Sequence, residues 1–225
     1  MAANINFSFD EATHTYMVDG VHIPSCTQCL DAAGLVMYDK IDPEVLRKAA
    51  KIGDYVHQAC AFYDEGRMGI GKGLDLEKLH PTLLPYVQAY IDWVKEVHFQ
   101  PGFIERDGNK VALIEYQGIG SIDGMLVGFQ LDGAGTIGTK GMEINYLIER
   151  KTTSVPLRVW GYQLAMYKMC ISELAGYRRA GLQLRDNGKA SVYPFDDDLG
   201  DEAVARAALV IATAKNNNRK SGGRA

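Results

Sequence analysis

The sequence predicts a mixed α/β fold, with helices packed on the faces of a central mixed β-sheet. Segments before residue 98 and after residue 157 carry apolar residues at helical spacing, which indicates amphipathic helices. Segments between them alternate apolar and polar residues with a period of two, which is typical of strands. Because 47% of the 225 residues are hydrophobic, the chain can bury a full core.

The first part of the chain is expected to form a hairpin followed by helices. Residues Ile5–Phe9 and Thr15–Val18 alternate, and Asp19-Gly20 supplies a tight turn into Val21–Ile23. Capping residues and a proline in the first turn then mark helix starts, and glycines mark helix ends. The expected helices are Ser25 or Thr27 to about Ala33, Asp42 to about Glu65, and Pro81 to Val97.

The middle of the chain changes to strand periodicity. The expected strands are Phe103–Arg106, Val111–Tyr116, Ile119–Val127 and Ile144–Glu149. The segment Gly128–Gly141 is rich in glycine and is predicted to be a connection rather than a strand. The remaining expected elements are a helix from about Leu157 to Leu174, strands Arg179–Leu184 and Ala190–Tyr193 around the Asn187-Gly188 turn, and a helix Glu202–Lys215.

We expect one domain over residues 1–214, followed by a tail over residues 215–225. Within the domain, the hairpin and first helices occupy residues 1–98, a sheet core residues 99–195, and a C-terminal helix residues 199–214. The tail contains Lys215, Arg219, Lys220 and Arg224 without an acid, which indicates a flexible basic tail or simply a solubilising terminus.

Composition narrows the classes of protein. No apolar run is long enough to span a bilayer, and the N-terminus lacks the features of a secretory signal, so we expect a cytoplasmic protein. Cys26 and Cys29 form a CxxC pair without a second pair, so the four cysteines are expected to be buried or partly buried free thiols. A net charge of −4 does not favour nucleic acid, but it does not exclude a local basic groove.

Three charged residues of the predicted sheet indicate a catalytic metal site. Glu149 and Lys151 lie two apart on a strand and project to one face, with Arg150 pointing outward between them. Asp123 ends the preceding strand, so it faces Glu149 if the two strands are antiparallel neighbours, and a divalent cation is the natural partner of both. Lys151 beside them can position a water or neutralise phosphate charge. The alternative is a turn aspartate and an exposed strand face.

Four short motifs occur in one order along the chain. They are GxxxH at Gly53–His57, GxxD at Gly120–Asp123, (D/E)xK at Glu149–Lys151 and QxxxY at Gln163–Tyr167. In order and spacing the set resembles the RecB-type branch of the PD-(D/E)XK nuclease superfamily, which includes phage exonucleases and mitochondrial genome-maintenance exonucleases. The segment from His14 to Thr27 also resembles phage-encoded members. Each motif is weak alone, and the ordered set is specific.

The resemblance implies a restriction-endonuclease-like core that binds one or two Mg²⁺ or Mn²⁺ ions. It implies metal binding by His57, Asp123, Glu149 and the Arg150 backbone carbonyl, catalysis by Asp123, Glu149 and Lys151, and site support or DNA contact by Gln163 and Tyr167. An upstream acid often joins such sites, and Glu105 has better spacing to Asp123 than Glu115 has. Some relatives hold an iron–sulfur cluster through one early and three late cysteines. Only Cys170 follows Lys151 here, so no cluster is expected.

The expected function is metal-dependent hydrolysis of DNA phosphodiesters. The resemblance favours an exonuclease acting on linear double-stranded or single-stranded DNA in phage-type or cellular recombination, repair or replication, together with a partner protein of that pathway. A structure-selective endonuclease is one alternative. A non-catalytic DNA-binding or assembly module on the same fold is another, as is a metalloprotein with an unrelated hydrolase activity.

Overall fold

The computed structural model describes residues 6–10, 13–36, 41–153 and 157–222, with side chains up to residue 216. Two short 3-10 helices lie at Leu76–Lys78 and Ser172–Leu174. The other elements are β1 (Phe7–Asp10), β2 (Thr15–Val18), β3 (Val21–Ile23), α1 (Cys26–Ala32), α2 (Pro43–Met68), α3 (Leu84–Val97), β4 (Gln100–Pro101), β5 (Phe103–Arg106), β6 (Asn109–Ala112), β7 (Ile114–Ile122), β8 (Met125–Ile137), β9 (Ile144–Lys151), α4 (Val159–Cys170), β10 (Arg178–Leu184), β11 (Ala190–Phe195) and α5 (Asp198–Gly222).

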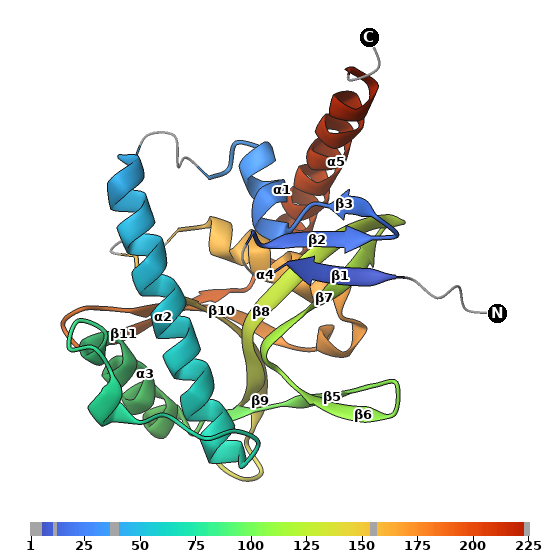
Figure 1. Cartoon of the computed structure of the whole chain (residues 1–225). Coiled ribbons are helices and arrows are strands. Elements are labelled where there is room, and N and C mark those ends of the chain that lie inside the picture. Colours follow the sequence, from blue (N-terminus) through green and yellow to red (C-terminus); the bar gives the residue numbers. More distant parts are fainter. Residues whose placement is uncertain (1–5, 11–12, 37–40, 154–156, 223–225) are drawn as a thin grey trace.

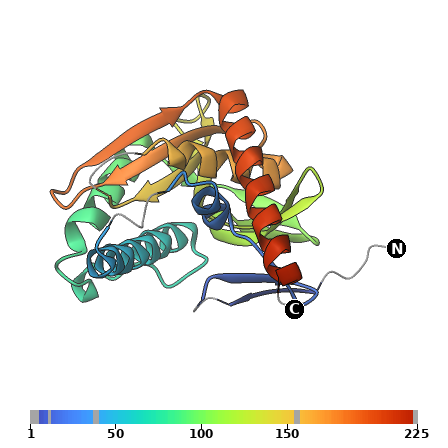
Figure 2. The ribbon, with the colours of Figure 1, turned by 90° about the horizontal axis from the view of Figure 1, so that it is seen from above.

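A six-stranded mixed sheet lies at the centre and confirms the predicted α/β class. Its strands follow the order β11-β10-β9-β8, and both β4 and β7 pair with β8. The β9–β10 pair is parallel, and the other pairs are antiparallel. Helices α2 and α3 pack on one face of the sheet, and α1, α4 and α5 pack on the other (Figure 1). Figure 2 shows the same layers from above.

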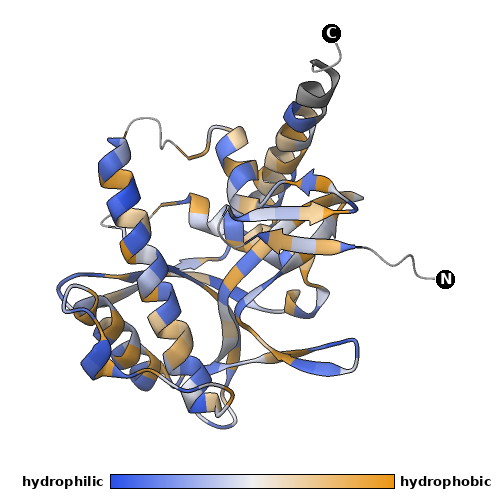
Figure 3. Cartoon of the chain, in the orientation of Figure 1, coloured by the Kyte–Doolittle hydropathy of each residue, from blue (hydrophilic) through white to orange (hydrophobic). Residues whose placement is uncertain are grey.

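Each face of the sheet has its own hydrophobic core. Leu147 of β9 packs on the side of α1, α4 and α5, whereas Ile148 packs on the side of α2 and α3, because successive strand residues point to opposite faces. On α2, Val56 and Cys60 lie one turn apart and belong to the buried stripe. Figure 3 shows hydrophilic and hydrophobic residues alternating along this helix, as expected when only one side is covered.

Side-chain caps begin the first two helices, as the sequence predicts. Ser25 and Gln28 form a reciprocal capping box at the start of α1. Asp42 accepts hydrogen bonds from the first backbone N–H groups of α2, ahead of Pro43. The helix continues beyond the predicted end at Glu65 and stops at Gly69, which has a left-handed φ of 69°. His57 lies near the middle of this helix.

The prediction that Gly128–Gly141 is a connection is wrong, because β8 runs through it as far as Ile137. Its glycines reflect close packing. A Cβ on Gly128 would lie 2.3 Å from the Tyr16 ring, and a Cβ on Gly135 would lie 2.0 Å from the Gln100 carbonyl oxygen. Glycine in this strand thus allows another segment to approach, and the central strand of the sheet lies where the sequence predicted a loop.

Helix α5 is longer than predicted at both ends. It begins at Asp198 and runs to Gly222, so a helix replaces most of the predicted flexible tail, while residues 223–225 lie outside the described part. Lys215 donates a hydrogen bond to the Ala32 carbonyl at the end of α1, at 2.7 Å. Among the described residues, no helix combines the length and apolar character needed to cross a membrane.

Candidate metal centre

Three acids lie in one row across β7, β8 and β9. The pairs that flank Glu115 and Asp132 are partners in the β7–β8 ladder, so these two acids lie opposite each other. The β8–β9 ladder ends where Gly133 lies opposite Ile148, so Asp132 and Glu149 are the residues that follow its last pair, close enough for the Asp132 charge to act on Glu149. Neighbouring strands thus bring together three carboxylates that are far apart in the sequence.

His57 reaches this row from α2. Its Nδ1 lies 3.2 Å from Asp132 Oδ1 and 3.7 Å from Glu115 Oε1, and the candidate ligand atoms of the three residues all lie within 4.8 Å of one another. Its Nε2 lies 3.0 Å from the Arg150 carbonyl oxygen, which can only accept a hydrogen bond. Nε2 therefore carries the hydrogen, and Nδ1 is the nitrogen directed at the acids. Oxygen ligands with one imidazole suit a divalent cation such as Mg²⁺ or Mn²⁺.

Glu115 occupies a strained backbone position. Its φ is 45°, in the left-handed region that costs a non-glycine residue on the order of 1–3 kcal/mol. Its Oε2 accepts a hydrogen bond from Gln130 Nε2 at 2.9 Å. Strain of this kind persists only where surrounding contacts hold it, and it concentrates at functional sites.

The charges of the cluster depend on one another. Burial disfavours a charged His57, but Asp132 and Glu115 raise its pKa above the usual 6.5. Burial likewise opposes ionisation of Asp132, yet His57, Lys151 and Arg150 hold its pKa well below the usual range. Without a cation, a protonated His57 thus neutralises part of the acid charge. A cation that bound here would take over that role, and Nδ1 would release its proton.

Glu149 and Lys151 lie beside this cluster. The Glu149 side chain is fully buried, and Lys151 Nζ lies 2.5 Å from its Oε1. Burial and the nearby Asp132 carboxylate raise the pKa of Glu149 to about 7, although Lys151 opposes the shift. Glu149 Oε2 is buried without a hydrogen-bond partner among the described residues. A buried carboxylate oxygen left in this way fits a missing cation or water.

Gln163 and Tyr167 share one face of α4, as their spacing predicts. Gln163 Nε2 donates to the Tyr167 hydroxyl at 2.5 Å, and both residues are buried. Burial, with the negative charge of Glu149 as the next cause, raises the pKa of Tyr167. Tyr167 therefore lies near enough to Glu149 for the two charges to interact, although neither oxygen of Glu149 has a hydrogen-bond partner among the described residues.

Two predicted site residues lie elsewhere. The predicted facing of Asp123 and Glu149 is wrong, because Asp123 forms the exposed turn between β7 and β8 and pairs with Arg206 of α5 at 2.5 Å. The length of β7, roughly 25 Å at strand spacing, separates it from Glu115. Glu105 lies exposed on the separate β5–β6 hairpin, opposite Lys110. Neither joins the cluster.

Sequence reasoning missed Asp132 and undervalued Glu115. Asp132 lies among the glycines of Gly128–Gly141, whose composition predicts a connection and so hides a strand residue. The spacing that favours Glu105 is the spacing to Asp123, and Glu115 has a similar spacing to Asp132. An acid flanked by apolar or small residues, as in Leu131–Ala134, is the signal that the sequence offers.

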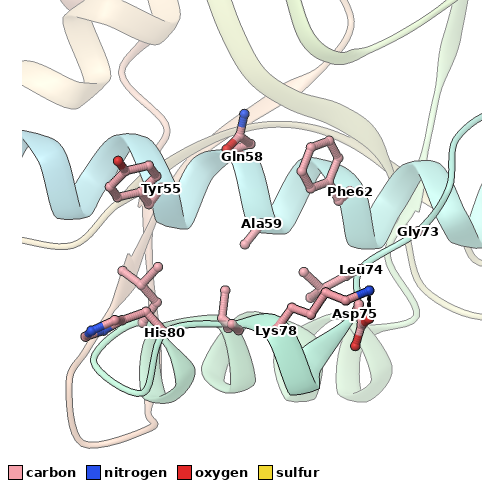
Figure 4. A pocket seen from close by; sticks show the side chains of 11 residues that line it. Tyr55, Gln58, Ala59, Phe62, Gly73, Leu74, Asp75, Lys78 and His80 are labelled. Carbon is pink, nitrogen blue, oxygen red and sulfur yellow. Dashed lines mark ion pairs between the residues drawn. The ribbon is translucent and has the colours of Figure 1, made fainter.

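A surface pocket lies between α2 and the segment that follows it. Tyr55, Gln58 and Phe62 line it from the helix, and Lys78 and His80 line it from the following segment (Figure 4). None of the clustered acids borders it. No family model and no curated protein matches the chain.

Proposed function

We propose that the chain is a metal-dependent DNA nuclease of the PD-(D/E)XK class. The observation that carries the proposal is the row of Glu115, Asp132 and Glu149, with His57 on one side and Lys151 on the other. A carboxylate cluster next to a lysine is the arrangement required to bind a cation and stabilise charge on a phosphate.

The proposal keeps the motif order and changes one assignment. Asp132 takes the metal-binding role first expected of Asp123, and Glu115 takes the role of the upstream acid. A strand order with β8 and β9 adjacent and α4 behind them agrees with the restriction-endonuclease-like core that the resemblance implies. His57, Glu149, Lys151, Gln163 and Tyr167 keep their expected roles.

Different residues of the site bind the cation, contact the phosphate and position the acids. A bound Mg²⁺ or Mn²⁺ supplies a Lewis acid for the scissile phosphate and lowers the pKa of a bound water. His57, Glu115 and Asp132 hold the cation, and Glu149 adds a further carboxylate. Lys151, with a side chain 25% exposed, can reach a phosphate and stabilise charge that develops in the transition state. Gln163 and Tyr167, which hydrogen-bond to each other on α4, lie near Glu149 and have a positioning role.

The test uses purified protein on DNA labelled at the 5′ or the 3′ end and on closed circles, with Mg²⁺, Mn²⁺ or EDTA. We expect loss of linear DNA with either metal and none with EDTA. By resemblance we expect an exonuclease, so the circles should survive, and the label released first gives the polarity.

Other outcomes point to the alternatives. Cutting of the circles would identify an endonuclease. Folded protein that binds DNA but cuts none with any metal would contradict the nuclease and leave the non-catalytic module. Cleavage that persists in EDTA would contradict the role of the metal.

A further inference from the structure

Arg150 buries its guanidinium on the side of β9 that faces α2 and α3. Strand alternation predicts that it points away from Glu149 and Lys151, and it does. The prediction that it points outward is wrong, because its side chain is only 1% exposed. A buried arginine requires several polar or charged partners to offset its lost hydration, and the identity of those partners indicates what Arg150 does.

One edge of Arg150 contacts the acids of the metal centre. Nη2 donates to Glu115 Oε1 at 2.5 Å and to the Asp132 carbonyl oxygen at 2.7 Å. The Arg150 backbone N–H donates to Asp132 Oδ2 at 2.5 Å. One carboxylate oxygen of each acid is therefore fixed, and Asp132 Oδ1 remains directed at His57.

The other edge is held by two helices. Asp64 of α2, which is 1% exposed, lies 3.8 Å from Nη1. Tyr90 of α3 donates its hydroxyl to Asp64 at 2.6 Å, and its ring centre lies 5.2 Å from the guanidinium carbon. Arg67 binds the second oxygen of Asp64 at 3.4 Å. On this edge Arg150 therefore has an ion pair and an aromatic contact, while its Nε and Nη1 are buried without a hydrogen-bond partner among the described residues.

We propose that Arg150 is a positioning residue for the metal centre and that Asp64 and Tyr90 hold it in place. Its fork keeps Glu115 and Asp132 next to His57, where two carboxylates without a positive partner would repel each other. The guanidinium also supplies a contact that maintains the strained backbone of Glu115. The role rests on the metal centre of the proposed function, and it concerns affinity for the cation rather than contact with DNA.

Arg150→Lys is the variant that tests this role. Lysine keeps the positive charge, but its single ammonium cannot bond Glu115, Asp132 and Asp64 together. Arg179→Lys is the matched control. Arg179 is also 1% exposed and lies on the adjacent strand β10, but its guanidinium binds Asp198 and the Gly161 carbonyl oxygen on the face covered by α4 and α5. Each variant removes a buried guanidinium, and only that of Arg150 contacts Glu115 and Asp132.

The measurement is isothermal titration of Mn²⁺ into each protein, after circular dichroism has shown that it folds. We expect Arg150→Lys to weaken Mn²⁺ binding by about 10–100-fold, the usual effect of removing a group that supports metal ligands. Arg179→Lys should bind Mn²⁺ as wild type does. Unchanged affinity in Arg150→Lys, or equal weakening in both variants, would overturn the role.

Tyr90→Phe keeps the test decisive if Arg150→Lys does not fold. It removes one hydroxyl and no charge, so we expect a smaller loss of Mn²⁺ affinity in the same direction, and unchanged affinity would then overturn the role. Failure of the proposed function looks different. Wild type that binds Mn²⁺ but cuts no DNA contradicts only the nuclease, whereas wild type that binds no Mn²⁺ contradicts the metal centre and the role of Arg150 with it.

Discussion

Lys151 is the residue whose chemical role can be separated most clearly from metal binding. Its Nζ lies 2.5 Å from Glu149 Oε1, and an ammonium group donates hydrogen bonds but offers no lone pair to a cation. Its positive charge contributes to the low pKa of Asp132 and opposes the burial that raises the pKa of Glu149, so it favours the ionised form of both acids. The same charge, a quarter exposed, is available to a phosphate.

We predict that Lys151→Ala folds, still binds Mn²⁺ and cuts linear DNA at least about 100-fold more slowly, as expected when a group that stabilises transition-state charge is removed. Single-turnover cleavage at saturating Mg²⁺ measures this. Lys168→Ala is the control, because Lys168 pairs with Asp198 at 2.8 Å and not with the acids. Wild-type cleavage by Lys151→Ala would contradict the role.

At the scale of single residues, the sequence predicted part of the candidate metal centre. His57, Glu149 and Lys151 were recognised because each lies in a motif with a fixed local spacing. Asp132 and Glu115 were not, because their place in the row depends on which strands are neighbours. Asp123 completes GxxD with Gly120, whereas Asp132 has Phe129 three residues before it, and only the length of β7 shows that Asp123 belongs to a turn.

At the scale of the element, β8 determines whether the site can form. It pairs with β7 and with β9, so it carries Asp132 between Glu115 and Glu149. Its glycines admit neighbouring segments that a side chain would exclude. Glycine-rich sequence normally indicates a loop, and the tertiary contacts that reverse this rule here cannot be read from a local window.

We predict that Gly135→Ala destabilises the fold by about 2 kcal/mol or more, because its Cβ would lie 2.0 Å from the Gln100 backbone oxygen and force β4 away from β8. Urea unfolding measures the free energy. Gly176→Ala is the control, since a Cβ there meets nothing within 4 Å, and it should change stability by less than about 0.5 kcal/mol. Equal effects of the two changes would contradict the packing argument.

At the scale of the whole molecule, α5 ties the C-terminal part of the chain to the sheet. Ala205 and Leu209 pack into the same core as α1 and α4. Asp201 is fully buried and lies 2.9 Å from Arg179 of β10, and it also binds Arg158 at the start of α4. The sequence predicted this helix but not its length, because the polar residues after Lys215 carry no apolar stripe.

We predict that Asp201→Asn destabilises the protein by about 3 kcal/mol, because loss of one partner leaves buried arginine charge poorly compensated. Asp197→Asn should be nearly neutral, since Asp197 is 67% exposed and lies 3.8 Å from Arg158. Thermal and urea unfolding compare the two. A neutral Asp201→Asn would show that the ion pairs do not anchor α5.

The most direct measurement is cleavage of labelled linear DNA in Mg²⁺ by Asp132→Asn and Asp123→Asn, each compared with wild type. Both changes replace one carboxylate oxygen with an amide nitrogen, one within the acid row and one at the turn that Arg206 binds. We predict that Asp123→Asn cuts as wild type does and that Asp132→Asn does not cut. Wild-type cleavage by Asp132→Asn would contradict the metal centre described for this protein.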